Sequence, residues 1–81
     1  MYNIYYSLVS TEWEGVDFET NANTPVKAFM CAVREIRTVL STMEVQFLPV
    51  DEMEFVIWAF GKCKGFLAIT EIGPETSVQD L

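Results

Sequence analysis

The stretch at residues 24–41, TPVKAFMCAVREIRTVLS, has the spacing of an amphipathic helix, and a helix with one apolar side needs a partner layer to cover that side. Pro25 suits the first helical position, where its missing N–H costs nothing, and Thr24 or Asn23 can cap the first amides. The larger apolar residues recur every three or four positions and form the expected core stripe: Val26, Phe29, Met30, Val33, Ile36 and Leu40. The outer side of the helix should carry three basic residues: Lys27, Arg34 and Arg37.

The residues before this helix have the composition of two β-strands. Residues 2–9 alternate, and their even-numbered side chains are the better candidates for the core. Residues 16–20 form the second strand, with Val16 and Phe18 on one side. A hairpin through residues 10–15 should join the two, with Gly15 able to supply a positive φ if the turn needs one. Alternatively, the second strand begins earlier, at Glu12, and has a bulge at Gly15.

After the helix, residues 44–48 predict a third strand that ends at Pro49, because proline cannot donate to a ladder. Residues 54–60, EFVIWAF, and residues 66–72, FLAITEI, are apolar runs of equal length around a glycine-flanked linker, which favours a hairpin. The alternative is a helix at 54–60, because Asp51 and Glu54 have the spacing of a capping box and apolar residues follow at helical intervals. We prefer the hairpin, because the run is short and rich in strand-forming residues.

The sequence therefore predicts an α+β fold of order ββαβββ, an antiparallel sheet of four to five strands with one helix packed on one face. Residues 1–73 should form a single domain and residues 74–81 a flexible C-terminal tail. One helix covers only one face, so large residues of 54–60 must project onto the other. The candidates are Val56, Trp58 and Phe60, or else Phe55 and Ile57. Such a patch is typical of a dimer or partner surface.

The chain has twelve acidic residues, five basic residues and no histidine, which gives a formal net charge of −7. This charge repels phosphates and anionic lipids, so we expect no direct nucleic-acid or membrane binding and a basic partner instead. Cys31 and Cys63 have no metal-knuckle or redox spacing and predict two free thiols. The start of the sequence lacks signal-peptide features and no apolar run is long enough to span a bilayer, so a cytoplasmic location is expected.

The residues that most catalytic sites require are missing from the sequence. Without histidine the commonest general base and metal ligand is absent, and the carboxylates lack the spacing of an EF-hand loop. The glycines at 61 and 65 are not followed by the Lys-Ser/Thr of a phosphate-binding loop. We therefore expect a binding protein rather than an enzyme, with no cofactor and no metal.

Two acidic segments are the candidate partner-binding site. The first surrounds a tryptophan, a residue enriched at interface hot spots, and carboxylates beside it can pair with Arg or Lys of a partner. The second is a mid-chain bend, which extends the same surface only if the sheet brings the two segments together. The candidate residues are Glu12, Trp13, Glu14, Asp17, Glu19, Asp51, Glu52 and Glu54.

The segments EWEGVDFE at 12–19 and DEME at 51–54 give the chain a general character that resembles small acidic phage-encoded anti-CRISPR and anti-restriction inhibitors. The resemblance implies that these carboxylates imitate DNA phosphates and occupy the basic DNA or PAM channel of a nuclease. The leading hypothesis is a non-enzymatic protein that inhibits or modulates a basic, nucleic-acid-handling host complex. The alternatives are a homodimeric structural or assembly subunit that uses the apolar second face of the sheet, and a small-molecule binder with a pocket between helix and sheet.

Overall fold

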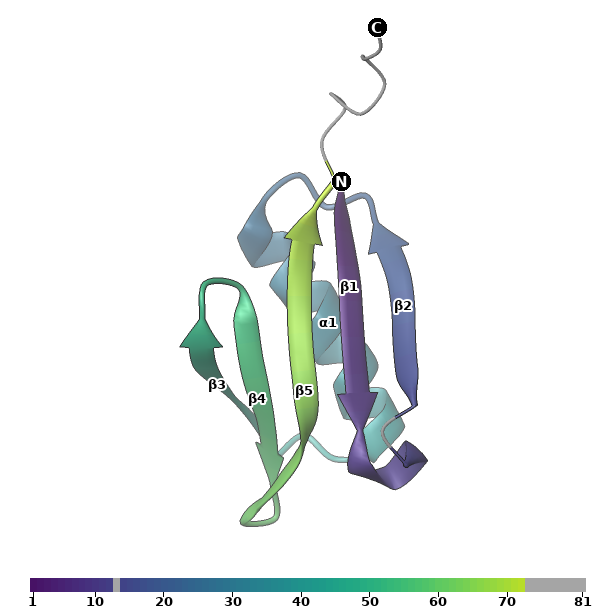
Figure 1. The fold of residues 1–81 in the computed structure, drawn as a ribbon, viewed down its shortest axis with the longest axis vertical. Helices are drawn as coiled ribbons and strands as arrows, with labels where there is room; N and C mark the ends of the chain where they lie inside the picture. Colours follow the sequence, from purple (N-terminus) through teal and green to yellow (C-terminus); the bar gives the residue numbers. More distant parts are fainter. Residues whose placement is uncertain (13, 73–81) are drawn as a thin grey trace, which may run out of the picture.

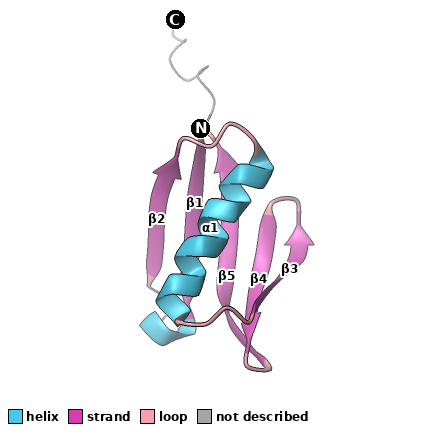
Figure 2. Cartoon of the chain, turned by 180° about the vertical axis from the view of Figure 1, so that it is seen from behind, coloured by secondary structure: helices cyan, strands magenta, loops and turns pink. Residues whose placement is uncertain are grey.

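The computed structural model describes residues 1–12 and 14–72, which form one helix packed against a five-stranded antiparallel sheet. The strand order is β2-β1-β5-β4-β3 (Figure 1). The helix α1 crosses one face of the sheet obliquely (Figure 2). The elements are β1 (Tyr2–Leu8), the short 3₁₀ helix η1 (Val9–Thr11), β2 (Gly15–Thr20), α1 (Pro25–Leu40), β3 (Val45–Asp51), β4 (Glu54–Ala59) and β5 (Lys62–Glu71). The predicted α+β fold and its ββαβββ order are confirmed.

Two of the sequence predictions concern residues outside the described part of the chain. These are Trp13 and the expected flexible tail at 74–81. Within the described residues, no helix combines the length and the apolar composition needed to cross a membrane.

Strand β1 confirms the predicted alternation, because its even-numbered residues, from Tyr2 to Leu8, are all at most 7% exposed. The connection to β2 differs from the prediction. Chain reversal occurs through η1 and a left-handed residue at Glu12, with φ 56°. Gly15 does not have a positive φ, and Ser7 pairs with Gly15 in regular register, so there is no bulge there. At Gly15 a Cβ would lie 2.5 Å from the outer end of the Tyr5 ring, so a larger residue there requires the ring to move.

The helix begins as predicted, with the Thr24 hydroxyl accepting a hydrogen bond from the amide of Lys27 at 3.2 Å. It ends at Ser41, which takes a left-handed conformation. The predicted core stripe is only partly correct. Val33 and Ile36 are buried, whereas Val26 and Met30 are 70% and 56% exposed.

The line of closest contact with the sheet instead includes Ala28 and Ala32, which have no exposed surface. These residues share one side of the helix with Ile36, at intervals of four. Small side chains let the helix axis approach the sheet, which displaces the larger residues to the flanks. Phe29 and Leu40 are therefore only partly buried against the core. Arg37, predicted to lie on the outer side, is also partly buried.

The prediction that the third strand ends at Pro49 is wrong, since β3 continues to Asp51. Because β3 is an edge strand, a residue without an N–H is tolerated there. The register shifts between Pro49 and Asp51, so the strand is irregular at this point. Irregularity and proline are common means of protecting a sheet edge from further pairing.

Residues 54–59 form strand β4, so the hairpin prediction is confirmed and the helical alternative is wrong. The hairpin turn is shorter than the predicted linker. Phe60 and Gly61 both have positive φ, as a two-residue turn of type I′ requires, and β5 begins at Lys62. Cys63 therefore lies in a strand rather than in a turn, and both cysteines are free, as expected.

The core lies between α1 and the strands β1 and β5, and Phe29 extends it towards the β3–β4 hairpin. The Phe29 ring lies 5.5 Å from Phe47 and 4.9 Å from Phe55, centroid to centroid. Phe55 and Ile57 thus face the helix. It is the other pair, Val56 and Trp58, that projects onto the second face of the sheet.

Candidate functional site

The face of the sheet turned away from α1, which we call the open face, is the side seen in Figure 1. Residues that pair directly across antiparallel strands share a face, so the register defines rows across it. One row runs from Asp17 on β2 through Tyr5 and Ala68 to Glu54 on β4. Its two ends are carboxylates, separated by three strand spacings, or about 14 Å. Glu19 lies on the same face, two residues along β2 from Asp17.

The next row of the open face is apolar towards β3. It runs from Ser7 through Phe66 and Val56 to Leu48. Leu48 is 44% exposed, and Phe66 and Val56 are partly exposed. Trp58 follows on the same side of β4 and is 36% exposed.

These side chains, together with Tyr5, form a hydrophobic strip that no helix covers. We call it the apolar strip, and it consists of Tyr5, Leu48, Val56, Trp58 and Phe66. The sequence prediction included Val56 and Trp58 but missed the other three. Alternation in β1 and β5 was the signal that could have found Tyr5 and Phe66, because each lies on the opposite parity to buried neighbours. Leu48 follows the partly buried Phe47 in β3, where the alternation is weaker. Phe60, also proposed for this face, lies in the β4–β5 turn, where the Lys64 ammonium sits 5.4 Å from its ring centroid.

Three of the predicted site residues thus lie on the open face in strands: Asp17, Glu19 and Glu54. Asp51 is the direct cross-strand partner of Glu54, so two carboxylates face each other at the end of the β3–β4 hairpin. Like charges in this arrangement destabilise a sheet slightly. Asp51 also has a local structural role, because its Oδ1 accepts a hydrogen bond from the amide of Glu52 at 2.8 Å. Glu52 lies in the turn itself and is exposed.

The two acidic loops do not come together. Strands β1 and β4 point the same way, since both run antiparallel to β5. Glu12 and Glu14 follow the end of β1 beside the edge strand β2, whereas Asp51 and Glu52 precede the start of β4 beside the opposite edge strand β3. The loops therefore occupy diagonally opposite corners of the sheet (Figure 1). The predicted site residues that lie on the open face between the two loops are those in strands.

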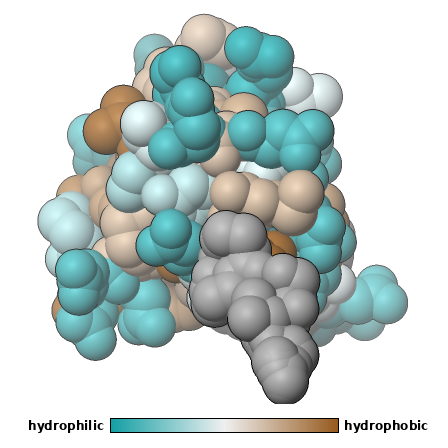
Figure 3. All heavy atoms as spheres, turned by 90° about the horizontal axis from the view of Figure 1, so that it is seen from above, coloured by the Kyte–Doolittle hydropathy of each residue, from teal (hydrophilic) through white to brown (hydrophobic). Residues whose placement is uncertain are grey.

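The positive charges lie elsewhere in the structure. Lys27, Arg34 and Arg37 are on α1, and Lys62 and Lys64 are at the start of β5. The open face beside β2 and the start of β4 is consequently acidic, and the helix side is basic. Figure 3 views the molecule from the end at which β1 begins, and much of the surface at that end is hydrophilic.

One titratable contact links the sheet to the helix. The hydroxyl of the buried residue Tyr6 donates a hydrogen bond to Glu35 Oε2 at 3.1 Å. Burial, and then the hydrogen bond and negative charge of Glu35, raise the pKa of Tyr6 to about 12. This contact lies on the helix side and stabilises the packing of α1 on β1.

The described residues 1–12 and 14–72 contain no group of three or more Cys, Asp or Glu side chains arranged to hold a metal ion. Comparison with protein-family models, with curated proteins and with solved structures gives no match to this chain. The arrangement of the open face is therefore the basis for a functional proposal.

Proposed function

We propose that this protein is a non-enzymatic binding protein that engages a basic partner through its open face. The observation that carries the proposal is the row Asp17, Tyr5, Ala68 and Glu54, in which carboxylates lie at both ends of a row that contains Tyr5 of the apolar strip. Partly exposed aromatic residues supply contact energy, while carboxylates at the border pair with Arg or Lys and select a basic partner. A hydrophobic area of this kind on one face of a small domain is typical of interaction sites.

The resemblance to small acidic inhibitors extends this proposal to the kind of partner. Proteins that handle nucleic acids present basic channels, which an acidic surface can occupy in place of phosphates. We propose that the protein inhibits or modulates such a complex, in the manner of anti-CRISPR proteins, and that it does so in the cytoplasm. Its own net charge of −7 disfavours direct binding to nucleic acid or to an anionic membrane.

The proposal is tested by capturing partners from bacterial lysate on the immobilised protein. The double variant D17K/E54K reverses both ends of the acidic row, and K27E/R34E is the matched control on the helix side. We expect a basic protein to be retained by the wild type and by the control, and its affinity to fall more than tenfold with D17K/E54K. Retention should also weaken at about 1 M salt, where the Debye length is about 3 Å. If both double variants retained the basic protein equally well, the open face would be excluded as its binding surface.

A second candidate function, a homodimeric assembly subunit, is favoured by the apolar strip. If two open faces stacked, however, the carboxylates of both copies would approach one another. Added salt would then strengthen the dimer, whereas it weakens a complex with a basic partner. Sedimentation at low micromolar concentration and at two salt concentrations distinguishes the two functions. A fraction of dimer that increases with salt supports the assembly subunit, and a monomer under both conditions excludes it.

A further inference from the structure

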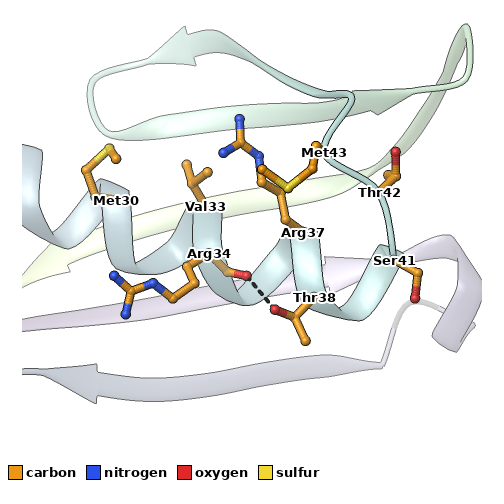
Figure 4. A pocket seen from close by; sticks show the side chains of 8 residues that line it. All are labelled: Met30, Val33, Arg34, Arg37, Thr38, Ser41, Thr42 and Met43. Atoms are coloured by element: carbon orange, nitrogen blue, oxygen red, sulfur yellow. Dashed lines mark hydrogen bonds between the residues drawn. The ribbon is translucent and has the colours of Figure 1, made fainter.

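A groove on the helix side of the molecule, away from the open face, has the features of a small-molecule site. It lies between the flank of α1 and the segment that connects α1 to β3 (Figure 4). Its volume is about 600 Å³, within the range of ligand sites in proteins. Three apolar side chains, two arginines and three hydroxyl residues line it: Met30, Val33, Met43, Arg34, Arg37, Thr38, Ser41 and Thr42.

Arg37 is the unusual member of this group. Its Nε is buried and has no hydrogen-bond partner within residues 1–12 and 14–72. A buried donor without an acceptor costs about 1–3 kcal/mol, and more when the group is charged. Figure 4 shows that the two arginines diverge, with Arg37 extending beside Met43 and Arg34 extending along the other flank of the helix. Of the two arginines, Arg37 is the one with a buried donor that lacks an acceptor within the described residues.

The hydroxyl groups around the groove are not equivalent. Thr38 donates its proton to the carbonyl of Arg34 at 2.9 Å, so that donor is already used. Thr42 accepts a hydrogen bond from the amide of Glu44 at 3.1 Å, which leaves its own proton available to donate. In Figure 4 the Thr42 hydroxyl and the Arg37 guanidinium point to the same side of α1, and that of Ser41 points to the other. Arg37 and Thr42 can therefore act as donors on one side of the groove.

We propose that this groove binds a small monocarboxylate with an apolar stem. A guanidinium is matched in shape by a planar carboxylate, which accepts two parallel hydrogen bonds. A monoanion is favoured over a phosphate dianion for two reasons: the groove lies at the C-terminal end of α1, where the helix dipole is negative, and the whole chain carries a net charge of −7. The apolar stem then lies along Met30, Val33 and Met43, which supply the hydrophobic part of the groove.

The proposal is tested by NMR titration of the ¹⁵N-labelled protein with hexanoate and with 1-hexanol, which has the same stem without the charge. We expect hexanoate to shift the amides of residues 30–43 and to bind at least tenfold more tightly than hexanol. Arg37→Met should remove this preference by weakening hexanoate more than tenfold with little effect on hexanol. Arg34→Met, the matched control, should change hexanoate affinity less than twofold. Equal affinity for the two ligands in the wild type would overturn the proposal.

A second pair of variants avoids any dependence on the folding of Arg37→Met. Met43 and Val26 are similarly exposed, at 71% and 70%, but only Met43 lines the groove. Met43→Asp should reduce hexanoate affinity at least tenfold, because it places a negative charge beside the carboxylate, and Val26→Asp should reduce it less than twofold. Equal effects of the two substitutions would contradict the site. Met43 also lines a second pocket beside Trp58, whereas Arg34 and Arg37 lie on α1, away from the open face. The arginine variants therefore let this proposal and the proposed function fail independently.

Discussion

The two faces of the sheet are built from alternate residues of the same strands, yet they differ in composition and in exposure. The face under α1 carries Ile4, Ile57 and Leu67, which have no exposed surface. On the open face Tyr5, which follows Ile4 in β1, is 37% exposed, and the carboxylates of Asp17 and Glu54 lie at the ends of its row. One helix of 16 residues, about 24 Å long, covers one face and leaves the other uncovered. The comparison indicates that stability depends mainly on the helix face, whereas the side chains of the open face remain more exposed.

The strongest test of this comparison is the same substitution on both faces. Leu67→Ala removes a fully buried side chain next to the helix and should lower the free energy of unfolding by about 2–5 kcal/mol. Leu48→Ala, on the exposed side of edge strand β3, should lower it by less than about 1 kcal/mol. Urea denaturation followed by circular dichroism measures both. Similar losses at the two positions would show that the open face also belongs to the core.

Gly15 in β2 and Gly65 in β5, the two strands that flank β1, offer a second comparison. A Cβ at Gly65 would collide with the backbone carbonyl of Ser7, which cannot move without disturbing the β1–β5 pairing. Gly65→Ala should therefore cost about 1–3 kcal/mol of stability. At Gly15 the colliding group is the outer end of the Tyr5 ring, which can rotate away into the uncovered space. Gly15→Ala should therefore lower the free energy of unfolding clearly less than Gly65→Ala in the same denaturation experiment. A larger loss for Gly15→Ala would contradict the account that the Tyr5 ring can move and the Ser7 carbonyl cannot.

The contact between Tyr6 and Glu35, on the helix side of the sheet, predicts that the free energy of unfolding depends on pH. Because the pKa of Tyr6 is raised to about 12 in the folded protein, from 10.0, the unfolded chain releases this proton first as the pH rises. The stability that the tyrosine contributes is complete below pH 10 and is lost as the pH rises towards 12. Tyr6→Phe should therefore be less stable than the wild type at neutral pH, and the difference should shrink over that window. A difference independent of pH up to 12 would argue against the contact.

The smallest expected effect lies on the open face. Glu54→Gln removes one charge of the directly opposed pair Asp51 and Glu54. Because like charges in this position are unfavourable, the substitution should raise stability by about 0.2–1 kcal/mol, and less at high salt. In the capture experiment the same variant should bind the basic partner more weakly. Gains in both stability and binding would remove Glu54 from the proposed surface.

Local patterns in the sequence were sufficient to predict the order of elements. Alternation identified the buried side of β1, and the Thr24–Pro25 pair correctly placed the start of α1. The buried stripe of the helix was predicted less well, because hydrophobicity favoured Val26 and Met30. Close packing on a sheet instead selected the smaller residues Ala28 and Ala32.

The candidate site depended on information that local patterns do not contain. Whether the acidic loops meet is determined by strand order, and the pairing of β1 with β5 is a long-range contact. That pairing separates Glu12 from Asp51 and brings Asp17 and Glu54 into one row. Tyr5 lies on the exposed parity of β1, and alternation alone does not show which exposed residues lie beside carboxylates on other strands.

The most direct test of the central claim is hydroxyl-radical footprinting of the protein alone and in complex with its captured partner. Binding through the open face predicts strong protection of Tyr5 and Trp58, with little change at the exposed Met30 on α1. Protection of Met30, with Tyr5 and Trp58 still reactive, would contradict the claim and place the partner on α1.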